Sequence, residues 1–404
     1  MTKVKNATSM VVLYGLILTL QRLGLNLFYP SMPDITESFK LYNIPIHNFV
    51  SLYILGGASI IILATVSDYL GRKKIIITGL FLSTLSSILA FLTHNPIILL
   101  CCRIMEGAAI GAATLIITAV NDSFSGNKLK KNLSKSSILF GLLSSLSFPI
   151  GATIAEQFTW KYNFLFFAMI SFTLAIFCLF CLDETCKNIK NKKLSNKTVL
   201  LDIKNILNYR PFIISILIEI SSVNLAVVFF IYSPFIFENS FKLSSINYSW
   251  LILVITATKM LSQHSLIRLI NKKSNYQIIK FSSIMLIACG TILLLLNKYH
   301  YLNYITLTAI IIVVFYVNNR LGNITTIISL EKFSDNKGTA TTIKNLSYFI
   351  SVYIINYIIA NYSGDKISIV NISIVTFGII MYTCILSLKE NIKESSHYRL
   401  EIIK

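Results

Sequence analysis

The stretch ATVSDYLGRKKIII, residues 64–77, decides how this chain folds, because it is a short charged turn between two long apolar runs. It contains one acid, Asp68, one glycine, Gly71, and three consecutive basic residues at 72–74. In the whole chain, 54% of the 404 residues are hydrophobic and 13% are charged, whereas soluble domains carry about 25% charged residues. Apolar runs of about 18 or more residues recur on both sides of the turn, which is typical of transmembrane helices.

The apolar runs predict an all-α membrane protein with twelve transmembrane helices. Gly56 and Gly57 interrupt the second of them. The predicted spans are 8–29, 48–66, 75–93, 97–120, 136–155, 163–182, 211–233, 248–267, 277–297, 304–328, 338–360 and 366–388.

The distribution of Lys and Arg orients these spans. With the N-terminus in the cytoplasm, 26 basic residues fall in cytoplasmic segments or at their borders, five in outer segments or at their borders, and five deeper within spans. Cytoplasmic segments of membrane proteins are enriched in Lys and Arg. The sequence therefore predicts that both termini are cytoplasmic, which requires an even number of spans.

The longest connection, residues 183–210, is rich in Lys and Asn and divides the spans into six plus six. We expect an N-terminal six-helix bundle at 1–182, a cytoplasmic linker at 183–210, and a C-terminal six-helix bundle with a short tail at 211–404. This layout is typical of secondary transporters. It leaves no room for a soluble catalytic domain, so we expect a transporter rather than an enzyme.

The opening turn resembles the cytoplasmic loop motif of the major facilitator superfamily. The match is S-D-x-x-G-R-K-K, with Asp68, Gly71, Arg72 and Lys73 in the motif positions and Ala64 where glycine is usual. The glycine permits a tight turn, and an acid near a helix end can pair with a basic group or with a helix N-terminus. The resemblance implies two facing bundles that work by alternating access, with this loop as a conformational latch.

Further stretches resemble the drug/proton antiporter group of this superfamily, of the MdfA/Cmr multidrug type. RIMEG (103–107) resembles the motif R-x-x-Q-G, with Glu106 in place of glutamine, and LSFPIGATIAE (146–156) resembles a Gly-Pro-rich antiporter motif that has lost several glycines. The subgroup is also indicated by YPSMPDITESF (29–39), WKYNFLFFA (160–168), YSPFIFENSFKLSSINYSWL (232–251) and FSDNKGTATTI (333–343).

The first span departs from this subgroup. The resemblance implies acids there that bind drug and proton, but aligned on Pro30 their positions fall at Leu18 and Asn26. The span has no carboxylate and carries Arg22 instead.

Charges inside the spans are the predicted site, because each costs about 2.5–3.5 kcal/mol at mid-bilayer on insertion scales. Five of them lie on spans 1, 4, 7 and 10, the helices that line the central cavity in the superfamily. The predicted substrate and proton site comprises Arg22, Asn26, Arg103, Glu106, Glu219, Asn319 and Arg320. We expect Lys344 to extend to the cytoplasmic surface, and we assign no role to Lys259.

Two carboxylates are candidate proton carriers. Arg103 and Glu106 are spaced i, i+3, so they share a helix face and can pair; the pair serves either proton and substrate exchange or static bracing of the bundle. Glu219 has no charged neighbour on its own span, which suits either a proton site or a hydrogen-bonded structural role.

Two functions remain open. The first is a proton-driven efflux antiporter for small lipophilic or cationic compounds in a bacterial inner membrane. The second is an importer or uniporter of an anionic or zwitterionic metabolite, favoured by the surplus of arginines. A membrane-embedded enzyme has no supporting motif. We expect a monomer in the lipid bilayer that binds a small molecule and protons, with no nucleic acid, metal or cofactor.

Overall fold

The computed structural model describes most of the chain, and the described secondary structure is helical throughout, without a β-strand. The described residues are 7–42, 44–116, 119–120, 126–185, 204–270, 272–330, 333, 337–361 and 364–388. Most of the predicted linker, at 186–203, lies outside them.

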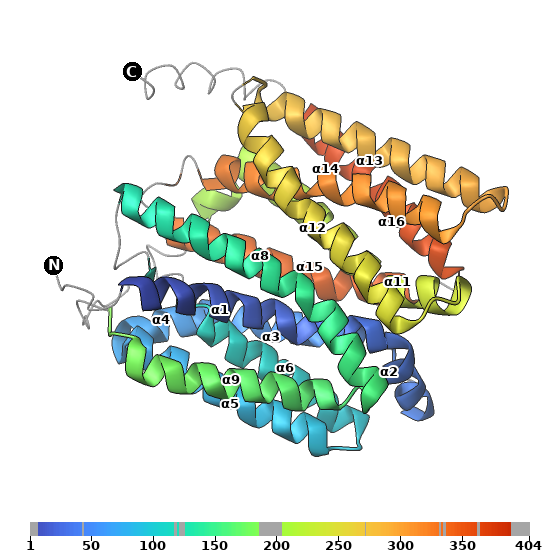
Figure 1. The fold of residues 1–404 in the computed structure, drawn as a ribbon. Helices are drawn as coiled ribbons and strands as arrows, with labels where there is room; N and C mark the ends of the chain where they lie inside the picture. The colour runs from blue at the N-terminus through green and yellow to red at the C-terminus, as the bar shows by residue number, and fades with distance from the viewer. Residues whose placement is uncertain are drawn as a thin grey trace. The chain divides into compact units, whose positions relative to one another are not determined.

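The first half of the chain forms the helices coloured blue to green in Figure 1. They are α1 (Ala7–Asn26), α2 (Met32–Phe39), α3 (His47–Gly56), α4 (Ile60–Leu70), α5 (Arg72–Leu92), α6 (Pro96–Ala113), α8 (Gly126–Gln157) and α9 (Tyr162–Cys181).

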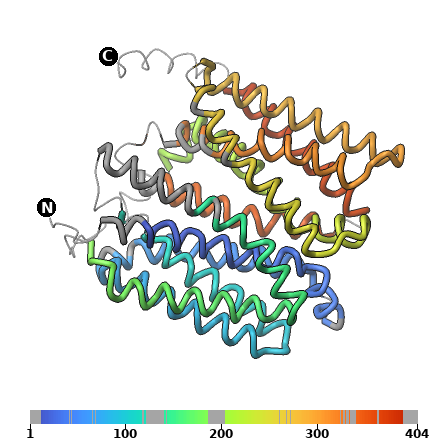
Figure 2. Tube along the Cα trace, in the orientation of Figure 1, coloured from blue at the N-terminus to red at the C-terminus, as the bar shows by residue number. Residues whose placement is uncertain are grey.

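The second half forms the helices coloured yellow-green to red in Figure 1, and Figure 2 shows the same path as a tube. They are α11 (Arg210–Pro234), α12 (Ser245–Ile270), α13 (Asn275–Lys298), α14 (Tyr304–Leu330), α15 (Lys337–Ala360) and α16 (Lys366–Leu386).

The predicted spans correspond closely to these helices. Within the described residues, 11 helical stretches are long and apolar enough to cross a membrane. The remaining predicted span, 136–155, lies inside α8, which is 32 residues long. The interruption expected in span 2 is present as a 3₁₀ turn at Gly57–Ser59 between α3 and α4.

Local sequence explains where helices begin. The Asn95 side chain accepts a hydrogen bond from the Ile97 N–H (2.8 Å) at the start of α6, immediately before a proline at the first helical position. Ser274 and Gln277 form a reciprocal capping box at the start of α13. Such caps satisfy N–H groups that the helix itself leaves unpaired.

The chain divides into two compact units, one of residues 1–193 with 243–253 and the other of residues 194–242 with 254–404. In the N-terminal unit, α1 packs against α8 and α9, and α6 packs against α3 and α5. In the C-terminal unit, α11 packs against α14, α15 and α16, and α13 packs against α14 and α16.

Glycines allow α3 and α6 to approach closely. A Cβ atom added at Gly107 would overlap the backbone oxygen of Tyr53, and one added at Gly56 would overlap the backbone oxygen of Ile104. Gly56 and Gly107 therefore serve close packing between α3 and α6. Between membrane helices, small residues permit close contact where the hydrophobic effect gives little attraction.

Candidate functional site

The Arg103–Glu106 pair predicted within α6 is formed, and it is sealed from solvent. The Glu106 carboxylate accepts hydrogen bonds from the Arg103 guanidinium and from the Ser87 hydroxyl on α5. The exposed fractions of the two charged side chains are 0% and 1%. All three residues belong to the N-terminal unit, so the burial arises inside one bundle.

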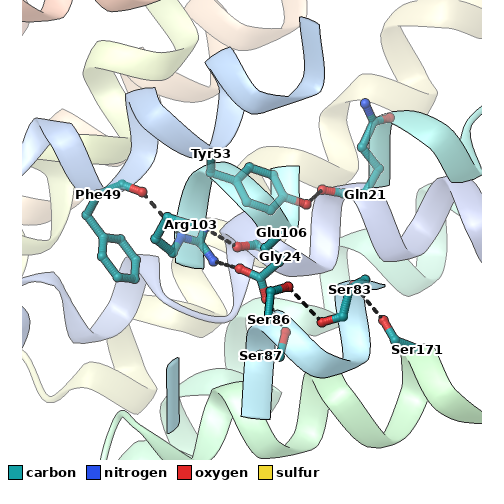
Figure 3. Close-up of polar contacts among 10 residues, drawn as sticks. All are labelled: Gln21, Gly24, Phe49, Tyr53, Ser83, Ser86, Ser87, Arg103, Glu106 and Ser171. Carbon is teal, nitrogen blue, oxygen red and sulfur yellow. Dashed lines mark hydrogen bonds and ion pairs between the residues drawn. The ribbon is translucent and has the colours of Figure 1, made fainter. Parts of the chain in front are cut away.

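The remaining donors of Arg103 are also satisfied (Figure 3). Its Nη2 donates to the backbone oxygen of Gly24 on α1 (2.6 Å), and its Nε donates to the backbone oxygen of Phe49 on α3 (3.3 Å). Four rings surround the guanidinium, with centroids 4.4–5.7 Å from Cζ: Phe28, Phe49, Tyr53 and Phe164. One side chain thus holds together α1, α3, α6 and α9, and Glu106 extends the network to α5.

The glycine that follows the arginine motif explains why these side chains meet around Arg103. Gly107 brings α3 against α6, and that approach places the Tyr53 ring over Arg103. The Tyr53 hydroxyl donates to the backbone oxygen of Gln21 on α1 (3.0 Å). The arginine motif and the glycine that follows it therefore work as one packing unit.

Arg22 and Asn26 on α1 have different surroundings. Arg22 is exposed, and no carboxylate lies within ion-pair distance of it among the described residues. Asn26 is partly buried, and its Nδ2 donates to the backbone oxygen of Ser144 on α8 (2.7 Å). Asn26, at a position where the resemblance implies an acid, therefore links α1 to α8.

Glu219 is not the lone carboxylate predicted from its own span. Lys344 of α15 places its Nζ 3.1 Å from Oε2 of Glu219 on α11, and the exposed side-chain fractions are 11% and 19%. Thr325 of α14 lies near the same carboxylate, and its hydroxyl donates to the backbone oxygens of Leu321 (2.9 Å) and Gly322 (3.1 Å). The prediction that Lys344 simply extends to the cytoplasmic surface is wrong, because α15 begins at Lys337 and Lys344 lies about two turns inside it, facing α11.

Polar residues around the predicted site residues Asn319 and Arg320 of α14 join three helices. Asn318 on α14 exchanges hydrogen bonds with Ser222 on α11, at 2.9 and 3.4 Å. Arg320 donates to the Ser265 hydroxyl on α12 (3.1 Å), and its Cζ lies 4.4 Å from the Tyr316 ring centroid. Asn319, between them, is partly buried.

The loop motif forms a joint between α5 and the end of α9. Gly71 has a φ of 90°, a conformation that side chains with a Cβ rarely adopt. The Glu184 carboxylate, just beyond α9, accepts hydrogen bonds from the N–H groups of Arg72 (3.0 Å) and Lys73 (3.2 Å). Lys73 Nζ donates to the backbone oxygen of Leu179 (2.9 Å).

Asp68, the acid of this motif, lies near the end of α4. Its side chain is outside the described part of the structure, so the predicted pairing of its carboxylate stays a prediction. Sequence reasoning missed Glu184 and the role of Lys344. A signal for Glu184 existed, since it follows the sixth span directly and the helix after Gly71 needs an acceptor at its N-terminus.

The predicted site residues thus form two separate sets. Arg103 and Glu106 are paired within the N-terminal unit, and Glu219 is joined to Lys344 within the C-terminal unit.

The family follows from comparison with known proteins. The sequence model of the Major Facilitator Superfamily matches residues 14–355 of this chain. This chain belongs to the Major Facilitator Superfamily. Its fold is therefore the twelve-helix fold of that superfamily, and membership accords with the expectation of a transporter rather than an enzyme. Its apolar helices fit a multi-pass membrane protein of this family.

Relatives support the resemblance to drug antiporters. An "uncharacterized transporter" of Rickettsia felis is 28% identical over 57% of each chain. The chloramphenicol resistance protein CraA of Acinetobacter baumannii is 27% identical over 37% of each chain. The chain thus spans about half the length, or less, of the curated relatives it matches. A solved D-xylose–proton symporter shares the fold, with a TM-score of 0.70 over 92% of this chain and 96% of that one at 14% identity.

Proposed function

We propose that this superfamily member exports small lipophilic compounds from the cytoplasm in exchange for protons, by alternating access of bundles at 1–182 and 211–404 joined by 183–210. The observation that carries the proposal is the antiporter-type motif in α6, whose arginine and glycine hold the N-terminal bundle together. The similarity to a chloramphenicol resistance protein supports the same direction of transport.

The charges in the described spans restrict the class of compound that we propose as cargo. Glu106 is paired with Arg103 and Glu219 with Lys344, so both mid-span carboxylates are neutralised by bases. Arg22 and Arg320 then remain as surplus positive charge. A cation would find no unpaired carboxylate among these groups, so the cargo we propose is neutral or carries a negative group, and the cationic class expected from the family loses support.

The same surplus favours a second candidate, an importer of an anionic metabolite. Arginine binds carboxylate and phosphate groups well because its planar guanidinium can donate two parallel hydrogen bonds. The two candidates differ in the direction of net transport relative to the proton gradient.

Inverted membrane vesicles that contain the protein test both candidates. Their lumen corresponds to the cell exterior, so an exchanger should accumulate radiolabelled chloramphenicol when the lumen is acidic. Collapse of the gradient by a protonophore should abolish the accumulation, and vesicles without the protein should show none. Lack of gradient-dependent accumulation, together with uptake of lactate or phosphate in right-side-out vesicles, would favour the importer.

A further inference from the structure

The chain lacks carboxylates in the first span, so the transported proton of the proposed exchange needs another carrier. The described interiors of the spans offer Glu106 and Glu219. These two groups differ sharply in their surroundings, and the difference points to one of them.

Glu106 is held in place from every side. Its carboxylate is bonded to Ser87 and Arg103, and Arg103 is itself fixed by two backbone oxygens and enclosed by four aromatic rings. The exposed fraction of the Glu106 side chain is 1%. A proton would have to enter a closed helix junction and would leave the buried guanidinium without its counter-charge.

Glu219 lies at a junction between helices that remains partly open. Its side chain is 19% exposed, and its partner Lys344 comes from a different helix, α15. The third helix at the junction, α14, places Thr325 near this carboxylate. The groups beside this junction are uncharged: Ser222 with Asn318, and Asn224, whose Nδ2 donates to the Ser351 hydroxyl (3.1 Å).

The charged side chains that the structure describes on α14 and α16 face elsewhere. Arg320 of α14 donates to Ser265 on α12. Lys366 is at the first position of α16, the outer end by the predicted topology, with its Nζ 4.0 Å from the Phe235 ring centroid. Lys344 is therefore the charged group that faces Glu219 within the described residues.

We infer that Glu219 takes up and releases the transported proton and that Lys344 is its counter-charge. Binding of one proton turns the Glu219 carboxylate into a neutral carboxylic acid, so the pair changes from zero net charge to +1. The ion pair between α11 and α15 is then lost, and the two protonation states favour different packing of these helices. A difference of this kind is what a proton needs in order to shift a two-state equilibrium.

This assignment rests on the proposed proton exchange but can be tested without transport. The test is a series of infrared difference spectra of the purified protein, recorded at pH values above about 4, where ordinary surface carboxylates are ionised. Such spectra report the carbonyl stretch of carboxylic acids that are still protonated. We expect a titrating band in the unmodified protein that Glu219→Gln removes and Glu106→Gln retains. Glu106→Gln is the matched comparison, because glutamine is the usual residue at that motif position.

The assignment is overturned if no band titrates, if the band persists in Glu219→Gln, or if Glu106→Gln also removes it. If Glu219→Gln fails to fold, Glu219→Asp keeps a carboxylate and should shift the band instead. In vesicles, Glu219→Gln should lower gradient-driven chloramphenicol accumulation at least tenfold while retaining exchange of labelled for unlabelled chloramphenicol. Absence of chloramphenicol transport by the unmodified protein would contradict the proposed function. The infrared result would then decide the proton site by itself.

Discussion

Arg103 is the residue on which the N-terminal bundle depends most. Its charge is fully buried and is balanced by Glu106, by two backbone oxygens and by aromatic rings. Removal of one member of a buried ion pair is far more costly than replacement of both, because the remaining charge loses its compensation.

Arg103→Ala should therefore lower the free energy of unfolding by about 3–5 kcal/mol, measured as a fall in thermal midpoint in detergent. The double variant Arg103→Met with Glu106→Leu should recover most of the loss, since it leaves no buried charge. Equal destabilisation by Arg22→Ala, at an exposed position without an ion pair among the described residues, would contradict this role.

Gly71 holds a backbone conformation that other residues avoid. Its φ is 90° and ψ is 144°, and an added Cβ would lie 2.5 Å from Oε2 of Glu184. Gly71→Ala should cost about 1–3 kcal/mol through strain and should displace Glu184. Gly322→Ala is the matched control, because a Cβ there meets nothing within 4 Å and alanine favours the helix. Similar thermal midpoints for the two variants would disprove strain at Gly71.

The sequence predicted one ion pair and missed the other for a geometric reason. Arg103 and Glu106 lie three positions apart on one helix, so helical periodicity is enough to bring them together. Glu219 and Lys344 lie on α11 and α15, and their contact depends on how two helices are rotated against each other. Local spacing carries no information about that rotation.

At the scale of elements, the joint between α5 and α9 gives the opening motif a physical role. A carboxylate at a helix N-terminus satisfies unpaired N–H groups and interacts favourably with the positive end of the helix dipole. Glu184 does this for α5, although four predicted spans separate it from Gly71 in sequence. The sequence signals that α5 needs an acceptor at its N-terminus, and the fold shows that Glu184 supplies it.

Glu184→Ala should therefore loosen the first turn of α5, and hydrogen–deuterium exchange should show faster exchange of the Arg72 and Lys73 amides. Asp183→Ala is the control, since the adjacent acid makes neither hydrogen bond. Unchanged protection at Arg72 and Lys73 would show that Glu184 is not the cap.

At the scale of the whole molecule, the fold was predictable because the membrane imposes strong constraints. Each span must be long and apolar, and the bias of Lys and Arg orients all spans together. The contacts of Glu219 and Arg320 with other helices were not predictable, because the pattern of one span does not show which residues of another span it meets.

The predicted topology can be tested by thiol labelling in a cysteine-free background. Lys242→Cys should react with a membrane-impermeant maleimide in intact cells, because residue 242 falls in a predicted outer segment. Lys273→Cys should react only in inverted vesicles. The opposite pattern would reverse the orientation derived from the basic residues.

The central claim is that outward movement of a lipophilic compound is coupled to inward movement of protons. Its most direct test is proton flux in liposomes that contain the purified protein and are loaded with chloramphenicol and a pH-sensitive dye. On dilution into drug-free buffer of the same pH, outflow of chloramphenicol should acidify the lumen, and Glu219→Gln should lose this signal. An unchanged or more alkaline lumen with the unmodified protein would contradict proton-coupled exchange.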